Sequence, residues 1–387
     1  MSATTTAAPR TAVPPRPAVS RVPFVDLGRM HAPLKAAILA DVGALVDAGA
    51  FANGPAVAEF ERAFAEACGT PFAVGVASGL DALRLGLIAL GIRSGDEVIV
   101  PADTFIATLE AVAQAGARPV LADVSESDYN LDVAAVEAAL TLRTRALLPV
   151  HLYGQLADMR ALRALAERHG LFVFEDACQA HGASRDGAVP GVGTAGAAFS
   201  FYPGKNLGAM GDAGALATTD EQLAVRLRAL REHGQTAKYR HGLEGFTSRL
   251  DTIQAIVLLH KLPHLSDWNR DRRQAAAGYA AGLEGVGDLV LPPIAPGSVP
   301  VWHLYVVQTK DPAALGAFLG ERGIGTGRHY PQPPHLSPAY ARLGYRAGAF
   351  PVTERLASRG LSLPIFAGIT AAEVEHVVAQ VRRYFDG

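Results

Sequence analysis

The sequence predicts an α/β protein with a large domain built on a mainly parallel β-sheet and a smaller α+β domain near its C-terminus. Three observations support this prediction. Short apolar runs alternate with amphipathic helical segments between residues 72 and 232, as in repeated βαβ units. One apolar run, 171–174, leads directly into Glu175 and Asp176, which is typical of the carboxyl end of a buried parallel strand. The alternation then stops at the polar, glycine-containing segment 239–249.

Up to residue 250, each expected strand is a short apolar run, and each expected helix carries apolar residues at helical spacing. The expected strands are 72–77, 97–101, 118–122, 146–150, 171–174, 197–201 and 213–218, the last of them a returning strand. The expected helices are 34–46, 56–67, 79–91, 104–115, 133–140, 159–169 and 221–232. This alternation implies a mainly parallel sheet with helices on both faces.

Beyond residue 250 the pattern predicts a smaller α+β unit. The expected helices are 252–261, 268–283, 312–322 and 371–384, and the expected strands are 289–292 and 302–308. We therefore expect a large domain over 21–250 and a small domain over 251–387. Residues 1–20 are rich in Ala, Thr, Pro and Arg and offer almost nothing to bury, which predicts a disordered tail.

Composition argues against several classes of partner. The net charge of −2 gives no basic footprint for nucleic acid, and no apolar run is long enough to span a membrane. The 387 residues include only two cysteines, Cys68 and Cys178, which are too few for a disulfide framework. Because the first 20 residues also lack the apolar core of a secretory signal, we expect a cytoplasmic protein that acts on small molecules.

Lys205 is the first candidate for chemistry. Only five of the 35 basic residues are lysines, and this one follows the expected strand 197–201 in a loop with Gly and Pro. A desolvated amine becomes a nucleophile that condenses with carbonyl groups. Asp176, at the end of another expected strand, is a candidate buried acid. The alternative interpretation of Lys205 is an ordinary loop lysine in solvent.

The turn Ser78-Gly79-Leu80 is a candidate anion site, because it joins the expected strand 72–77 to the following helix. Free backbone N–H groups at a helix N-terminus point at a ligand, and the helix dipole favours negative charge there. The alternative is an ordinary strand-to-helix turn in which Ser78 is only the N-cap.

Pyridoxal phosphate needs this combination of groups: an amine, a buried acid, phosphate donors and a stacking surface. Ser200 offers a further hydroxyl, Phe105 an aromatic face and Gln179 an amide. A nucleotide-binding P-loop does not fit, because Asn206 follows Lys205 where Ser or Thr is required. The twelve scattered histidines show no metal-ligand spacing, so we expect no metal.

Six motifs carry a more specific signal, namely PADTFIAT (101–108), PVHLYGQ (149–155), EDACQAHGA (175–183), SFYPGKNLG (200–208), SRLDTIQA (248–255) and GRHYP (327–331). They resemble the DegT/DnrJ/EryC1/StrS aminotransferases, in the same order, over roughly residues 22–385. The resemblance implies pyridoxal-phosphate fold type I, the aspartate aminotransferase-like architecture, and a homodimer with shared active sites. It also implies transamination of a keto group on a nucleotide-linked deoxysugar, with L-glutamate as the amino donor.

The resemblance assigns roles to individual residues. Lys205 corresponds to the lysine that forms a Schiff base with the cofactor, and Asp176 to the partner of the pyridine nitrogen. Gln179 would approach the ring hydroxyl, and Phe105 would stack on the ring. The expected cofactor-binding set is Ser78, Gly79, Leu80, Phe105, Asp176, Gln179, Ser200, Lys205 and Thr247, and the catalytic pair is Lys205 and Asp176.

Two of these positions depart from the family pattern. Leu80 stands where a threonine is frequent, which removes one hydroxyl from the phosphate site. Thr247 stands where an asparagine often reaches the phosphate bound by the partner subunit. The expected substrate contacts are Tyr153, His181, Tyr239, His329 and Tyr330, although His181 could equally be a hydrogen-bonded core histidine.

Two further functions compete with this interpretation. A deoxysugar dehydratase of the same family has histidine at the lysine position, so Lys205 argues against it. A pyridoxal-phosphate-binding regulator without turnover would not need the complete set of cofactor groups. For the sugar, we favour amination at C3 of a dTDP-linked 3-keto-6-deoxyhexose over C4 of a 4-keto sugar, by resemblance of the 79–83 and 238–249 segments.

Overall fold

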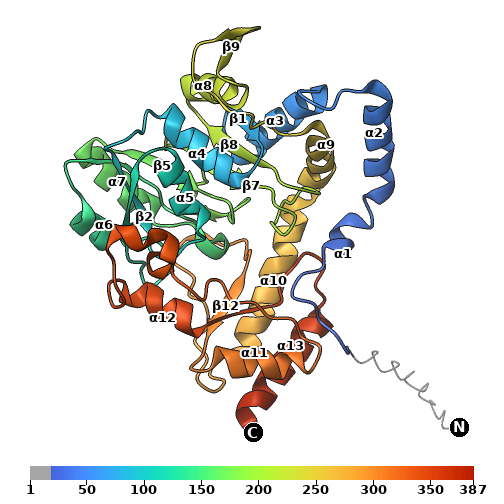
Figure 1. Ribbon diagram of the computed structural model, residues 1–387. Coiled ribbons are helices and arrows are strands. Elements are labelled where there is room, and N and C mark those ends of the chain that lie inside the picture. The colour runs from blue at the N-terminus through green and yellow to red at the C-terminus, as the bar shows by residue number, and fades with distance from the viewer. Residues whose placement is uncertain (1–18) are drawn as a thin grey trace, which may run out of the picture.

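The computed structural model describes residues 19–387, and its centre is a seven-stranded sheet in the order β1-β8-β7-β5-β4-β2-β3 (Figure 1). Strand β8 pairs antiparallel with both neighbours, and the other pairs are parallel, which confirms the predicted mainly parallel sheet. The strands of the sheet are β1 (Phe72–Val76), β2 (Glu97–Pro101), β3 (Arg118–Ala122), β4 (Thr144–Leu147), β5 (Phe172–Asp176), β7 (Gly196–Ser200) and β8 (Gly214–Thr218).

Helices cover both faces of this sheet, because side chains alternate between the faces along each strand. In β7, for example, Ala198 belongs to one core and Phe199 to the other. The first face packs against α4 (Gly79–Ala89), α5 (Ala107–Gln114) and α8 (Glu221–Arg231). The second face packs against α3 (Pro55–Cys68), α6 (Val133–Ala139), α7 (Met159–His169) and α9 (Thr252–Lys261).

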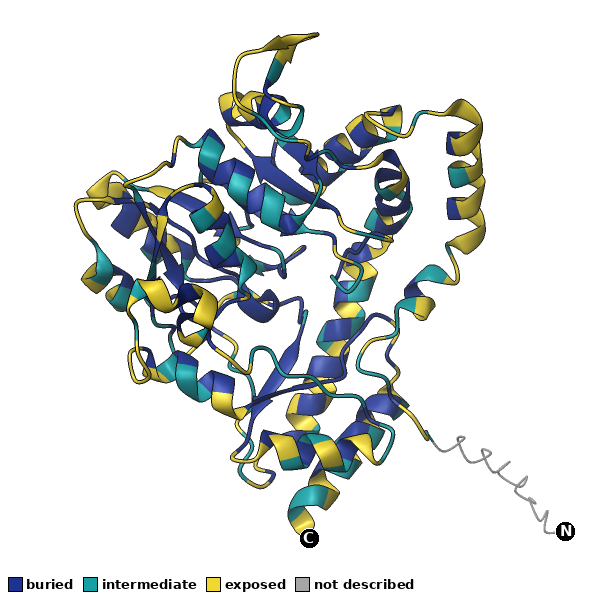
Figure 2. Ribbon diagram, viewed as in Figure 1, coloured by how far each residue is buried: buried dark blue, intermediate teal, exposed yellow. Residues whose placement is uncertain are grey.

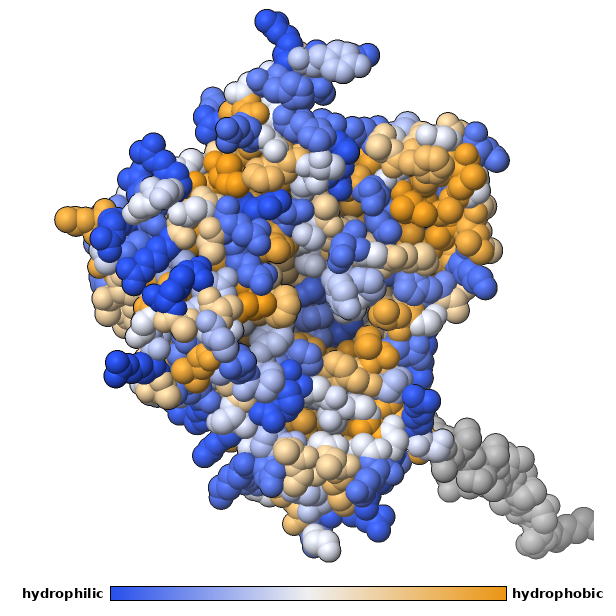
Figure 3. Space-filling model, viewed as in Figure 1, coloured by the Kyte–Doolittle hydropathy of each residue, from blue (hydrophilic) through white to orange (hydrophobic). Residues whose placement is uncertain are grey.

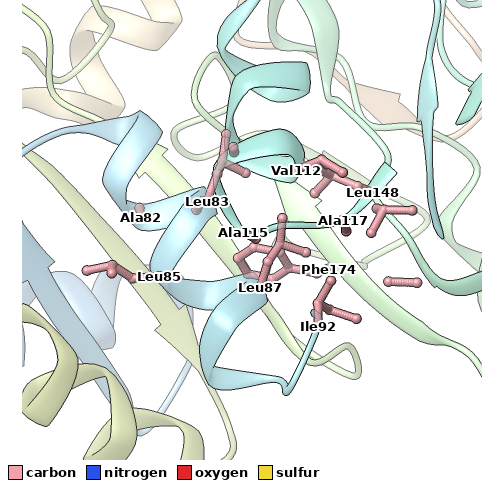
Figure 4. Close-up of a cluster of buried hydrophobic side chains, with 14 of the residues drawn as sticks. Ala82, Leu83, Leu85, Leu87, Ile92, Val112, Ala115, Ala117, Leu148 and Phe174 are labelled. Carbon is pink, nitrogen blue, oxygen red and sulfur yellow. The ribbon is translucent and has the colours of Figure 1, made fainter. Parts of the chain in front are cut away.

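Close packing on the first face sets the position of α4. Leu83 and Leu87 of α4 meet Phe174 of β5 in a continuous apolar cluster (Figure 4). Gly86 permits this approach, because a Cβ atom there would lie 2.3 Å from Cζ of Phe174. Burying a phenylalanine side chain contributes about 1.5–3 kcal/mol. The contact therefore holds α4 with its N-terminus at the carboxyl edge of the sheet.

A second, smaller core lies beside the long helix α10 (Leu265–Leu283), which runs down from the sheet (Figure 1). It contains α11 (Pro312–Gly320), α13 (Ala371–Asp386) and the antiparallel pair β12 (Tyr305–Gln308) and β13 (Gly360–Leu363). Arg29 of α1 (Leu27–His31) binds Glu373 of α13 at 2.7 Å and holds the pKa of that carboxyl down to about 2. The remaining elements include α2 (Lys35–Ala48), α12 (Pro351–Arg359), β6 (Ser184–Arg185), β9 (Gln235–Ala237), β10 (Arg240–His241) and β11 (Ser298–Val299).

Some sequence expectations need correction. The predicted strand 289–292 is a single bridge between Val290 and Gln308, because the prolines that follow have no N–H to continue a ladder. The strand predicted over 302–308 begins only at Tyr305, and the helix predicted over 104–115 begins only at Ala107. Most of the predicted tail, residues 1–18, lies outside the described part of the chain.

Residues 19–387 contain neither a helix suited to span a membrane nor a metal-binding cluster of side chains. No helix in this range combines the length and the apolar character that a membrane crossing needs. No group of three or more His, Cys, Asp or Glu side chains in the same range is arranged to hold a metal ion.

Candidate active site

One cavity of about 570 Å³ lies at the carboxyl ends of the parallel strands, beside the N-terminus of α4. The sheet, the first turns of α4 and α5, and residues after 300 all contribute to its walls. Open α/β sheets bind their ligands at this edge. The cavity contains most of the residues that the sequence predicted for the site.

The loop 201–213, which connects β7 to β8, carries Lys205 into the cavity wall. Because β8 returns antiparallel to β7, Ser200 pairs with Gly214 and joins the two ends of the loop. The backbone N–H of Lys205 donates to Tyr202 O at 2.8 Å inside the loop. From outside, Lys261 Nζ on α9 donates to the carbonyl of Gly208. The loop is therefore held by the strand pair at its two ends, by the hydrogen bond between residues 202 and 205, and by Lys261 of α9.

Lys205 is half-buried and lines the cavity, so the alternative of a lysine fully in solvent is wrong. Burial lowers its pKa below the ordinary value, although the negative charge of Asp176 opposes this effect. Burial favours the neutral form of an amine, which is the nucleophilic form.

Asp176 is buried at the end of β5, where the sequence predicted it. Its Oδ2 accepts a hydrogen bond from Thr108 Oγ1 at 2.8 Å, and its Oδ1 accepts one from the backbone N–H of Cys178 at 3.2 Å. The hydroxyls of Thr108 and Thr104 are 2.8 Å apart, which extends the network. Burial raises the pKa of the Cys178 thiol well above its ordinary value, so this cysteine stays protonated and acts in packing.

Ser78, Gly79 and Leu80 form the anion site at the start of α4. Ser78 Oγ accepts the N–H of Asp81 at 3.1 Å and is therefore an N-cap, as the alternative interpretation held. The N–H groups of Gly79 and Leu80 have no hydrogen-bond partner within residues 19–387, as is usual in a first helical turn. A Cβ on Gly79 would lie 2.5 Å from Cβ of Ser200, so glycine keeps this cradle open.

Gln179 is held between two tyrosines. Its Oε1 accepts the backbone N–H of Tyr153 at 2.7 Å, and its Nε2 donates to the hydroxyl of Tyr330 at 3.2 Å. Tyr153 also donates its hydroxyl to His329 O at 2.6 Å, and thus supports the cavity wall from behind. The ring of Phe105, 52% exposed, lies in the wall at a centroid distance of 5.4 Å from Tyr330.

His181 does not lie where the substrate interpretation requires. Its ring is buried against Phe199 and Phe201 at centroid distances of 5.4 and 5.7 Å, in the core of the second sheet face. Burial lowers its pKa to about 3. The chain turns after β5, and this turn directs the side chain away from the cavity into the core. The core alternative is therefore right about the position of His181, but neither ring nitrogen has a hydrogen-bond partner within the described residues, so its hydrogen-bonded part is wrong.

Tyr239 and Thr247 also lie outside this cavity. The β9–β10 hairpin projects from the body of the molecule (Figure 2). Tyr239 lies in the turn of this hairpin and is 82% exposed. Thr247 is exposed nearby, with its Oγ1 3.2 Å from Nε2 of His233.

Sequence reasoning missed three residues of the cavity region: Thr108, which holds Asp176, and His303 and Arg272 in the wall. Thr108 lies within a motif that was noted only for Phe105. Arg272 falls on the apolar stripe of α10, together with Ala275, Ala276 and Tyr279. A charged residue on a buried helix face is a signal that could have identified it.

The residues that meet in this cavity fit pyridoxal phosphate. Gly79 and Leu80 offer free N–H groups to a phosphate, Asp176 offers a fixed buried carboxylate, and Lys205 offers an amine with a lowered pKa. The fold and this site together define a pyridoxal-phosphate-dependent enzyme of fold type I.

Comparison with known proteins gives the family. The model of the DegT/DnrJ/EryC1/StrS aminotransferase family matches residues 33–382, and the chain belongs to this family. The dTDP-3-amino-3,4,6-trideoxy-alpha-D-glucose transaminase of Streptomyces venezuelae is 50% identical over 364 residues, which cover 94% of this chain and 96% of that protein.

Two solved structures share the fold over nearly the whole chain. S. venezuelae DesV in complex with a ketimine intermediate superposes with a TM-score of 0.93 and 49% identity, covering 95% of this chain and all of that one. NtdA from Bacillus subtilis with bound cofactor PMP gives a TM-score of 0.88 and 32% identity, covering 95% of this chain and 86% of that one.

Proposed function

We propose that this aminotransferase converts the keto group at C3 of a dTDP-linked 3-keto-6-deoxyhexose into an amine, with L-glutamate as the amino donor. The observation that carries the proposal is the half-buried Lys205, which shares one cavity with Asp176 and the cradle of α4. The position on the sugar is supported by the 50% identical relative, whose name specifies a 3-amino sugar. The two unpaired cysteines support a cytoplasmic location.

Each site residue has a proposed task. Pyridoxal phosphate supplies, when bound, an aldehyde that combines with amines and a protonated ring that withdraws electrons. Lys205 Nζ would hold the cofactor through its aldehyde and, when free, would be the group in the described cavity wall that moves a proton. Asp176 keeps the proton on the ring nitrogen, and Gln179 orients the ring through its hydroxyl. Gly79, Leu80 and Ser200 would hold the phosphate, and Phe105 would offer its exposed ring as a stacking surface.

The sugar assignment predicts one amino product. With L-glutamate and dTDP-3-keto-6-deoxyhexose, the purified protein should form the 3-amino sugar and 2-oxoglutarate, identified by mass spectrometry and NMR. The matched control is the 4-keto isomer, which should give little amine. Amination of the 4-keto isomer alone would favour the C4 alternative. If glutamate is converted to 2-oxoglutarate but neither keto sugar is aminated, the assignment as a transaminase stands and both proposed sugar substrates are refuted.

We also propose a homodimer in which each site uses residues of both chains. Tyr239 and Thr247 stand at positions that contact the substrate and the phosphate in the family. In this chain they lie outside the cavity of their own subunit. Large apolar side chains are exposed on α2 and beside it, including Leu39, Val46 and Phe51. Figure 3 shows an apolar surface at the upper right, where α2 lies in the same view of Figure 1. Exposed apolar surface of this kind is typical of an interface, and two-fold dimers are the commonest oligomers.

Complementation tests this arrangement. A Lys205→Ala chain is mixed with a chain that carries Tyr239→Ala and Thr247→Glu, and each is inactive alone. After random reassociation, half of the dimers are mixed and each has one intact composite site, so about one quarter of wild-type activity should return. Sites built from single chains would give no activity at any mixing ratio, and an active monomer in ultracentrifugation would also contradict the proposal.

A further inference from the structure

Arg272 is a buried cation in the wall of the cavity, and its charge has no acidic partner. It lies on α10, is 2% exposed and contributes to the cavity lining. Within residues 19–387, no carboxylate lies within ion-pair distance of its guanidinium. Charged side chains are rarely buried without a partner of opposite charge, because desolvation then goes uncompensated.

The hydrogen bonds of this guanidinium all leave from one nitrogen. Nη1 donates to the carbonyls of Trp302, His303 and Ile365 at 3.1, 3.3 and 3.0 Å. Nε is buried without a hydrogen-bond partner in the described chain. A guanidinium presents five N–H donors in a planar fork that matches a carboxylate. Nη2 makes no hydrogen bond within the described chain either, so the Nε–Nη2 side of the guanidinium has no partner there.

The cations that line the cavity are few. Among the basic side chains in the lining, Lys205 and Arg272 are the ones that can carry a positive charge near neutral pH, whereas His303 and His329 are neutral. Burial lowers the pKa of Lys205 and lowers the pKa of Arg272 to about 10. Burial, together with the charge of Lys205, lowers the pKa of His329 to about 4 and that of His303 well below its ordinary value. When the amine of Lys205 is occupied in the reaction, Arg272 is the positively charged side chain that remains in the described lining of the cavity.

His303 cannot take the same role, because its hydrogen bonds fix the tautomer. Asn206 donates its Nδ2 to Asn269 Oδ1 and to Val301 O, both at 2.9 Å, so its Oδ1 is free to accept. The Nδ1 of His303 lies 3.2 Å from that Oδ1 and must carry the proton. In a neutral ring, Nε2 of His303 is then a hydrogen-bond acceptor. Its lone pair would repel a carboxylate oxygen, so His303 cannot bind an anion there.

We infer that Arg272 binds a carboxylate of the amino donor and so selects an amino acid over a simple amine. This inference rests on the proposed use of glutamate. The phosphate of the cofactor has its own donors at the start of α4, where Gly79 and Ser200 lie. Lys205 and Arg272 line the same cavity, and so does His303, whose backbone carbonyl accepts a hydrogen bond from Arg272 Nη1. A donor that reacts beside Lys205 can therefore place its carboxylate near Arg272.

Glutarate, which has the carboxylates of glutamate but no amino group, tests the inference without turnover. Calorimetry should show that Arg272→Gln raises the Kd of glutarate about 10- to 100-fold, as expected for a lost charge-assisted hydrogen bond. Arg272→Lys, which keeps the charge, should recover part of this affinity. The neutral diamide of glutaric acid should bind weakly to all variants. Arg270→Gln, in the exposed ion pair of the same helix, should match the wild type.

A purely structural role for Arg272 predicts a different pattern. Loss of its carbonyl contacts would lower the melting temperature and weaken glutarate and keto-sugar binding alike. Selective carboxylate binding instead predicts a higher KM for glutamate, with an unchanged reaction of the aminated cofactor form with the keto sugar. Unchanged glutarate affinity in Arg272→Gln would overturn the inference. If neither variant folds, a crystal structure of the wild type with glutarate decides by whether a carboxylate oxygen lies within hydrogen-bond distance of Arg272.

The outcome for glutamate itself is separate. A wild-type protein that binds glutarate at Arg272 but does not react with glutamate would refute the proposed donor and leave the carboxylate site standing. A wild-type protein that reacts with glutamate while Arg272→Gln binds glutarate normally would refute the carboxylate site alone.

Discussion

Replacing Lys205 with alanine should abolish the visible absorbance of the bound cofactor and lower turnover by more than about three orders of magnitude. The reason is that the described lining of the cavity contains no second lysine. The fold should persist. The backbone bond from residue 205 to Tyr202 O does not need the side chain, and Ser200 and Gly214 still join the loop ends. We therefore expect a change in unfolding free energy of less than about 1 kcal/mol.

The measurements are an absorbance spectrum, steady-state kinetics and denaturant unfolding, with Lys310→Ala as the control. Lys310 is exposed, and its hydrogen bond to Asp288 uses only the backbone N–H. The control should keep wild-type absorbance and turnover. Normal transamination by Lys205→Ala without any added amine would refute the assigned role of this lysine.

Asp176→Asn should lower kcat by about two to three orders of magnitude, as expected when one charged group that stabilises a transition state is lost. A neutral amide cannot keep a proton on the pyridine nitrogen. The local structure should survive, because Asn has the same shape and the Thr108 and Thr104 hydroxyls can reverse their direction of donation.

Cofactor should still bind to the Asn variant through Lys205 and the cradle of α4, so its Kd is measured beside kcat. Asp267→Asn removes the same charge from an exposed ion pair and should leave both quantities unchanged. A kcat within a fewfold of the wild type in Asp176→Asn would contradict the role of this carboxylate.

Local sequence signals were sufficient for much of the fold and the centre of the site. Asp176 was found because an apolar run ends in an acid, and Ser78 because small residues separate a strand from a helix. Both signals follow from burial and hydrogen bonding within a few residues. The segment 289–292 looked equally strand-like, but its prolines prevent the pairing that an apolar run suggests.

The rest of the site depends on contacts between distant segments. His181 lies two residues beyond Gln179, yet the turn between them sends one side chain to the cavity wall and the other to the core. Arg272 meets carbonyls from residues 302–303 and 365, and no local periodicity could reveal these partners. A charged residue on an apolar helix face can be noticed in the sequence, but the carbonyl groups that Arg272 contacts are identified only in the folded chain.

The returning strand β8 has a consequence for the entropy of the reaction. Because the loop 201–213 leaves β7 and re-enters the sheet next to the same strand, its ends are already joined by the Ser200–Gly214 pair. Closing a loop costs conformational entropy that grows with the logarithm of its length, and here that cost is met when the protein folds. The buried ammonium of Lys261 restricts the loop further at Gly208. Lys205 thus begins each turnover preorganised, with little backbone freedom left to lose when substrate arrives.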